Sequence, residues 1–191
     1  MFTAHNEGLT FEKISRPGER LVDLRFEHCT FSGCDLSRCD LSRSRFVECA
    51  FQGCDLSMMK LAGAALQQVR FVECKLLGVD LSVCSEMLFS VGFERCMMDH
   101  AVLAGRRMRG TRFIQCAMRG VDLERADLEA AVLDRCDLRD AVFERTTLRD
   151  ADLTTVIDHR IDPARNDLRG ARFSVEGALC LLAGSGIVVE H

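Results

Sequence analysis

The chain has 191 residues, 48% hydrophobic and 28% charged, with a formal net charge of −4. This length is sufficient for one domain with its own core, and no apolar run reaches the roughly 18 residues that a membrane-spanning helix needs. The charge is too small to indicate a partner class by itself. The opening residues, MFTAHNEGLTFEK, lack the features of a secretory signal, so we expect a cytoplasmic protein whose 11 cysteines are reduced thiols.

A regular pattern begins at Leu21, after residues 1–20, which contain a predicted turn at Pro17-Gly18 and are expected to form an N-terminal cap. From Leu21 to Leu81 every fifth residue is Leu or Phe. The pattern returns from Leu88 to Leu153 with Leu, Phe or Met at every position. A period of five gives no continuous stripe on a helix and changes face on a flat strand. Each five-residue unit is therefore interpreted as one side of a coil, with a corner between units.

The cysteines predict how many sides the coil has. Six of them form a series with spacings of 20, 20, 22, 20 and 20 residues: Cys34, Cys54, Cys74, Cys96, Cys116 and Cys136. A turn of 20 residues contains four units, and the single spacing of 22 indicates a two-residue insertion within residues 82–87. Equivalent positions elsewhere hold Cys, Ala, Val, Thr or Ser. That choice of residues is typical of a packing site, so we interpret the thiols as small core residues rather than metal ligands or disulfides.

Two charged residues break this packing rule next to the insertion. Glu86 and Arg106 occupy positions at which other turns carry small residues such as Ala64 and Ala126. A buried charge requires a partner, so we expect either that Glu86 pairs with Arg106 or that the wall bulges and exposes both. Alternatively, Glu86 belongs to the inserted loop. The apolar residues 87–89 make residues 82–90 a candidate contact patch.

Charge is unevenly distributed in the second half of the coil. Residues 101–120 contain five arginines and no acidic residue, whereas residues 121–155 contain ten acidic residues and five arginines. The acidic stretch is comparable in charge density to duplex DNA, which carries about one charge per 1.7 Å of its axis. Opposite charges within a Debye length of about 8–10 Å partly cancel. The pattern therefore fits either an acidic binding surface or an ordinary solvated surface with ion pairs.

The C-terminal residues 156–191 predict a short helix. Ser174 is a suitable N-terminal cap, and Val175, Leu179 and Leu182 lie on one face at helical spacing. Gly184 or Gly186 would end the helix. The following apolar residues, which include Ile187, provide more apolar surface than a cap needs. We therefore expect this segment to close the coil and to join two copies in a homodimer.

Units such as CDLSR, CDLSM, ADLEA, CDLRD and ADLTT resemble those of the pentapeptide-repeat family. The resemblance implies an all-β solenoid, a right-handed quadrilateral β-helix over residues 21–155, with a short C-terminal α-helix. The tail IDPARNDLRGARFSVEGALCLLAGSGIVVEH is similar to those of quinolone-resistance and peptide-antibiotic immunity members. Those members imply a DNA mimic that binds DNA gyrase or topoisomerase IV, with resistance to a quinolone or a peptide toxin as the outcome.

On this reading the candidate partner-binding residues are Asp122, Glu124, Asp127, Glu129, Asp137 and Asp140, and the candidate dimer residues are Val175, Leu179, Leu182 and Ile187. The alternative is a protein-interaction scaffold whose partner is not a topoisomerase. Direct nucleic-acid binding is not expected, because the sequence contains no Tyr or Trp for base stacking. An enzyme is also not expected. The five histidines share no position in the repeat, and no catalytic, cofactor or metal motif is present.

Overall fold

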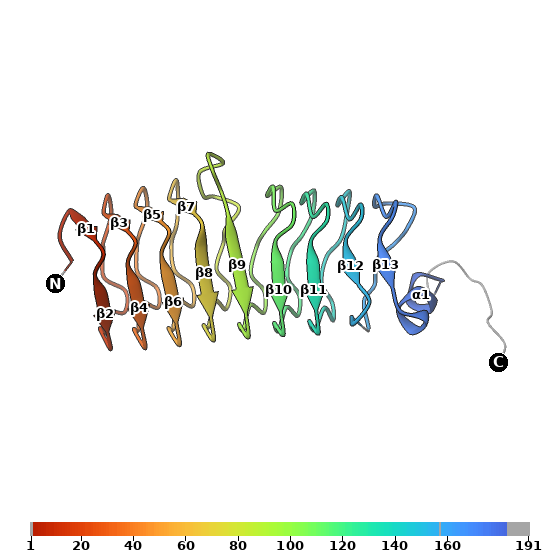
Figure 1. Cartoon of the computed structure of the whole chain (residues 1–191), viewed down its shortest axis with the longest axis horizontal. Coiled ribbons are helices and arrows are strands. Elements are labelled where there is room, and N and C mark those ends of the chain that lie inside the picture. Colours follow the sequence, from red (N-terminus) through yellow and green to blue (C-terminus); the bar gives the residue numbers. More distant parts are fainter. Residues whose placement is uncertain (1, 157, 183–191) are drawn as a thin grey trace.

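The computed structural model of the chain describes residues 2–156 and 158–182. These residues form a straight rod of stacked turns, with the helix α1 at its C-terminal end (Figure 1). The elements are β1 (His5–Glu7), β2 (Thr10–Glu12), β3 (Arg25–Glu27), β4 (Thr30–Ser32), β5 (Arg45–Val47), β6 (Ala50–Gln52), β7 (Ala65–Gln67), β8 (Val69–Val72), β9 (Val91–Glu94), β10 (Arg112–Ile114), β11 (Val132–Asp134), β12 (Asp152–Leu153), β13 (Arg172–Phe173) and α1 (Val175–Leu182).

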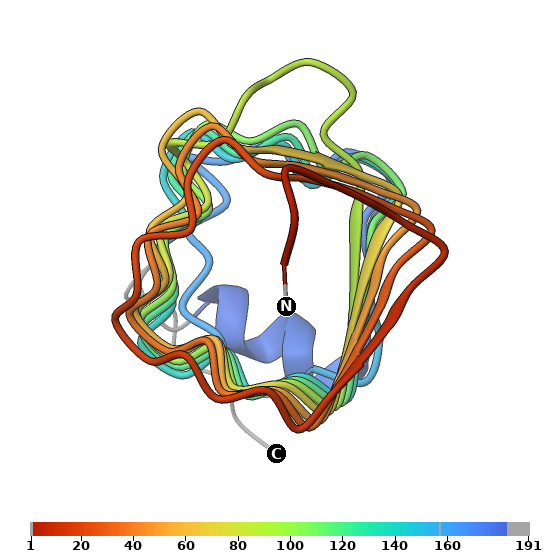
Figure 2. The same cartoon turned by 90° about the vertical axis from the view of Figure 1, so that its left-hand side faces the viewer.

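The strands form two parallel ladders on adjoining sides of the rod. One ladder has the order β1-β3-β5-β7, and the other runs from β2 to β13 through nine strands. Residues 20 apart are paired, as in Phe31↔Phe51, and the offset becomes 22 across the insertion, as in Phe71↔Phe93. Isolated bridges such as Asp35↔Asp55 and Asp40↔Lys60 continue the stacking beyond the two ladders. Viewed end-on, the turns superpose in a four-sided outline (Figure 2).

The predicted fold class is confirmed: the chain is a parallel β-solenoid of about 8 turns with one short C-terminal helix. With about 4.8 Å between neighbouring strands, eight turns give a rod of roughly 38 Å. No helix among the described residues is long and apolar enough to cross a membrane.

The coil extends beyond the boundaries expected at residues 20 and 155. His5 pairs with Arg25 and Ser15 with Asp35 at the N-terminal end, and Asp152 pairs with Arg172 at the other. The N-terminal turn departs from the five-residue apolar pattern at Asn6 and Arg16, while Phe11 between them keeps it. Asn6 occupies an inward position. Its buried amide donates to the Arg25 carbonyl oxygen at 3.1 Å, so an internal hydrogen bond replaces apolar packing there.

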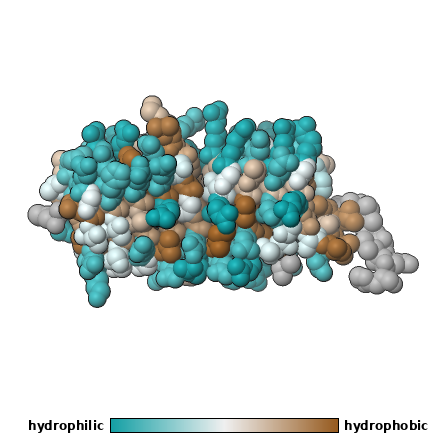
Figure 3. All heavy atoms as spheres, viewed as in Figure 1, coloured by the Kyte–Doolittle hydropathy of each residue, from teal (hydrophilic) through white to brown (hydrophobic). Residues whose placement is uncertain are grey.

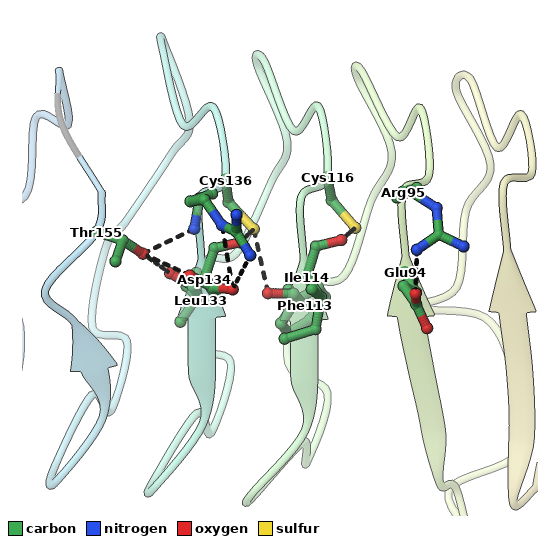
Figure 4. A network of polar contacts seen from close by, with 10 residues as sticks. Glu94, Arg95, Phe113, Ile114, Cys116, Leu133, Asp134, Cys136 and Thr155 are labelled. Atoms are coloured by element: carbon green, nitrogen blue, oxygen red, sulfur yellow. Dashed lines mark hydrogen bonds and ion pairs between the residues drawn. The ribbon is translucent and has the colours of Figure 1, made fainter.

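The interior contains stacks of like residues. The rings of Phe31 and Phe51 lie 4.5 Å apart and nearly parallel, and the stack continues across the insertion, where Phe71 and Phe93 are 5.3 Å apart. The role of the cysteines in packing is confirmed for ten of the eleven, which are free and buried, while Cys180 is half-buried. Several thiols donate to backbone carbonyl oxygens of the preceding turn, as Cys136 does to Phe113 at 3.3 Å (Figure 4). Burial raises the pKa of Cys49 to about 11, which keeps this thiol protonated.

Candidate interaction surfaces

The repeated aspartates stabilise the corners of the coil. The Oδ1 atom of Asp35 accepts the backbone N–H of Ser37 at 3.0 Å, and Asp122 accepts the N–H of Glu124 at 2.9 Å in the same way. Asp137 does so with Arg139 at 3.2 Å. An aspartate that bonds the backbone two residues later forms an Asx turn. One oxygen of many of these carboxylates is therefore already hydrogen-bonded to the backbone of its own corner.

The six candidate acidic residues do not form one strip along the rod. Asp122 stacks between Val102 and Val142, whereas Asp127 stacks between Arg107 and Thr147. Asp137 belongs to a third ladder, through its bridge to Ala117. The candidates are therefore distributed around the rod rather than collected on one face.

Arginines from the basic stretch neutralise two of these acids directly. Arg109 donates to Asp127 at 2.6 Å, and Arg119 donates to Asp137 at 2.6 Å. Arg139 donates to the same Asp137 oxygen at 2.6 Å. These guanidinium groups, Arg139 first, hold the pKa of Asp137 well below its usual range. The predicted cancellation of opposite charges is present as specific ion pairs.

The other candidate acids are paired less tightly. Glu129 lies 3.5 Å from the Arg109 guanidinium and Glu124 lies 3.3 Å from that of Arg125. Asp140, the most exposed of the six, lies 3.8 Å from Arg160. Asp122 makes no ion pair within the part of the chain that the structure describes. Five of the six acids therefore have an arginine within 4 Å.

The expectation that Glu86 and Arg106 occupy equivalent positions in the wall, and either pair or are exposed together, is wrong. Cys84, not Glu86, fills the inward position and is buried, while Glu86 is exposed in the loop, as the alternative reading had it. Counting 20 residues forward from Ala64 would have placed Cys84 there. Arg106 is buried and makes no ion pair among the described residues.

Arg106 binds the backbone of the loop instead of a carboxylate. Its Nη1 donates to the Cys84 carbonyl oxygen at 2.8 Å, and its Nη2 donates to that of Ser85 at 2.9 Å. Its guanidinium carbon also lies 4.0 Å above the centre of the Phe89 ring. Burial lowers the pKa of Arg106, but the carbonyl dipoles and the ring face partly replace the missing counter-charge.

The insertion forms a loop, residues 82–90, that projects from the side of the rod (Figure 2). Leu88 was expected to resume the inward apolar pattern, but its side chain is 60% exposed and Phe89 packs against the core instead. Met87 is 75% exposed. In the space-filling view an apolar area rises above the mostly hydrophilic surface where this loop projects (Figure 3).

The helix α1 lies across the open end of the coil (Figure 2). The Ser174 hydroxyl accepts the N–H of Gly177 at 3.0 Å, which confirms the predicted cap. Val175 and Leu179 are exposed and Leu182 is half-buried. Ile187 lies outside the described residues. The candidate dimer residues of α1 therefore include two apolar side chains available to a second copy.

Within residues 2–156 and 158–182, no group of three or more His, Cys, Asp or Glu side chains could hold a metal ion. The fold and these surfaces define a repeat protein whose candidate interaction residues lie along the outside of a rod. Family comparisons agree with this class. A model described as "Pentapeptide repeat region" matches residues 24–103, and one described as "Pentapeptide repeats (8 copies)" matches residues 122–157. Together they cover more than half of the sequence, and the chain belongs to the pentapeptide repeat family.

Two solved structures of similar fold span nearly the whole chain. Two trypsin-treated single-substitution variants of QnrB1, a plasmid-mediated fluoroquinolone resistance protein, share 20% identity over 97% of both chains, with TM-scores of 0.70 and 0.66. HetL, a pentapeptide repeat protein involved in heterocyst differentiation regulation from the cyanobacterium Nostoc sp. strain PCC 7120, shares 17% identity over 90% of this chain and 89% of its own, with a TM-score of 0.49. No curated protein matches the sequence.

Proposed function

We propose that this protein is a non-enzymatic binder of a type II topoisomerase, DNA gyrase or topoisomerase IV, and that it occupies the enzyme's DNA-binding surface. Resistance to a quinolone or a peptide toxin would be the outcome. The observation that carries the proposal is the rod itself, which repeats charged side chains every turn along a straight axis. The full-length likeness in fold to a fluoroquinolone resistance protein supports it.

The acidic candidates supply the charge that the proposal requires. Asp122 is free of ion pairs among the described residues, and Asp140 is widely exposed with only a long contact to Arg160. A topoisomerase surface that normally holds phosphates would compete for these carboxylates with the neighbouring arginines. Because such competition depends on screened charges, salt should weaken binding.

A second function is favoured by the ion pairs. Arg109 and Arg119 neutralise Asp127 and Asp137, which leaves a rod with less accessible negative charge than its sequence indicates. The most exposed apolar side chains of the coil lie on the loop 82–90. These two observations support a protein-interaction scaffold whose partner is not a topoisomerase.

The deciding experiment is a gyrase supercoiling assay with the purified protein, with and without a fluoroquinolone, at several salt concentrations. The test variant neutralises all six candidates as D122N/E124Q/D127N/E129Q/D137N/D140N. Asparagine retains the oxygen that closes each Asx turn, so charge is removed with little change in the corners. The matched control, D35N/D40N/D55N/D80N/E27Q/E48Q, removes the same number and kind of charges from the other half of the rod.

We expect salt-sensitive inhibition or drug rescue by the natural protein, and a loss of about tenfold in potency in the test variant only. An equal loss of potency in both variants would show that the effect depends on the net charge rather than on the candidate residues. No effect on the enzyme at high molar excess would reject the topoisomerase and leave the scaffold function.

A further inference from the structure

A groove with a volume of about 330 Å³ lies beside the loop 82–90. We call it the loop groove. Met87 and Leu88 of the loop line it, together with the small residues Gly63 and Ala65 of the neighbouring turn. Arginines from two further turns, Arg25, Arg43 and Arg45, line it as well. Asp23, which is paired with Arg43, also lines it. The groove therefore combines apolar walls with a cationic wall whose net charge comes from Arg25 and Arg45.

Two of the arginines lack an acidic partner. Arg25 on β3 and Arg45 on β5 are paired in register, so they lie on adjacent rungs of the ladder. Both are exposed, and neither has an ion pair within the described residues. Arg43, in contrast, donates to both oxygens of Asp23, at 2.7 and 2.6 Å. Like charges opposite each other on neighbouring strands are unfavourable, so a bound anion would relieve this repulsion.

The apolar part of the groove is held in place before any ligand binds. Arg106 does not line the groove, but its hydrogen bonds to the Cys84 and Ser85 carbonyl oxygens fix the base of the loop. Phe89 lies under the Arg106 guanidinium and packs against the core. A preformed wall reduces the entropy cost of binding.

We propose that the loop groove binds an acidic peptide segment of a partner protein. Its carboxylates would contact Arg25 and Arg45, and one apolar side chain would pack against Met87 and Leu88. Nucleic acid fits less well, because it gains affinity from many phosphate contacts and from stacking on aromatic rings. The groove offers two unpaired arginines and no aromatic side chain. The inference does not depend on a topoisomerase being the partner.

The probe is a fluorescein-labelled peptide of glutamates with a central leucine, and the readout is fluorescence anisotropy. Three comparison probes replace the leucine by glycine, replace the glutamates by glutamine, or consist of single-stranded DNA. We expect saturable binding of the first probe at low salt and at least about tenfold weaker binding of each other probe. Absence of saturable binding, or equal binding of the DNA, would overturn the proposal.

Substitutions test whether the peptide binds in the loop groove. R25E/R45E should weaken binding of the leucine peptide by about tenfold or more, and M87S/L88S should abolish the preference for leucine over glycine. The matched control is R70E/R112E, which reverses two exposed arginines of β8 and β10 that also lack ion pairs among the described residues. If the control weakens binding as much as R25E/R45E does, the attraction is not specific to the groove and the proposal is wrong.

A fourth variant, R106M, tests the contribution of the loop base. It should weaken binding of the leucine peptide and leave binding of the glycine peptide unchanged, because only the apolar wall of the loop groove is disturbed. Circular dichroism checks that it is folded. If it is not, the two surface variants still decide the proposal.

Discussion

At the scale of the residue, the buried side chain of Arg106 contacts the inserted loop at several points. Arg106 is only 4% exposed and its Nε atom has no hydrogen-bond partner, yet its Nη atoms donate to the Ser82, Cys84 and Ser85 carbonyl oxygens and its guanidinium lies over the Phe89 ring. Removing it would leave the Cys84 and Ser85 carbonyl oxygens without a donor. A buried polar group left unsatisfied costs about 1–3 kcal/mol.

We therefore expect R106L to lower the free energy of unfolding by about 2–3 kcal/mol and to open the loop. Urea unfolding measures the first effect. Thermolysin digestion measures the second, since it should cleave R106L fastest near Leu88 and Phe89. The neighbouring substitution R107L, at an exposed position, is the control and should change neither. Unaltered cleavage in R106L would show that the loop keeps its shape without the arginine.

His159 is expected to make the C-terminal end sensitive to pH. Its ring is buried, neither ring nitrogen has a hydrogen-bond partner, and it lies against Gly177 of α1 and the ring of Phe173. Burial lowers the pKa of His159, and the Gly177 backbone and Asp158 oppose this shift only in part. The folded state therefore favours the neutral ring. The resulting stability is complete above the unfolded pKa of about 6.5 and falls as the pH drops from there toward the folded pKa.

Hydrogen exchange in residues 175–182 should accordingly speed up between about pH 7 and pH 5, after correction for the intrinsic rate. The variant H159F should show a much smaller change, because it carries no titrating group at this site. H100F, at an exposed histidine, is the control and should behave as the natural protein does. The same pH dependence in H159F would assign the effect to another group.

At the scale of the element, α1 has one face that packs on the coil and one face that is exposed. Gly177 faces the coil, where an added Cβ would lie 3.3 Å from the Val156 carbonyl oxygen, so the glycine permits close docking. Val175 and Leu179, four residues apart, are exposed. A symmetric interface between two copies at this end would bury Val175 and Leu179 of each copy.

The expected homodimer can be tested with V175D/L179D. The two charges should convert a dimer into a monomer, measured by light scattering coupled to size exclusion. M97D/V142D is the matched control, since it places two charges at apolar residues on the side of the rod that are 46% exposed. A natural protein that is monomeric at all concentrations would contradict the prediction.

At the scale of the whole molecule, each turn contacts only the turns before and after it. Stability in such a solenoid is close to a sum of nearest-neighbour terms, so the ends open more easily than the middle. The reactivity of the buried cysteines can measure this local opening at several points along the rod. Cys29 follows β3 near the N-terminal end and Cys136 follows β11 near the C-terminal end, while Cys74 and Cys96 follow β8 and β9 between them.

In mild urea, thiol alkylation followed by mass spectrometry should label the half-buried Cys180 first. Cys29 and Cys136 should follow, and Cys74 and Cys96 should be last. The control is the fully denatured chain, in which all 11 cysteines should react at similar rates. If every buried thiol were alkylated at the same rate in mild urea, the rod would open only as one cooperative unit.

The sequence alone determined the coil, its four sides and the place of the insertion, because inward positions recur locally with a period of five and pack against the same position one turn away. The helix cap at Ser174 followed from local rules in the same way. The exposure of Leu88, the inward turn of Phe89 and the carbonyl contacts of Arg106 were decided only in three dimensions. So was the pairing of Asp127 with Arg109 and of Asp137 with Arg119. These features depend on which side chains meet across turns and around an irregular loop, and no period describes that.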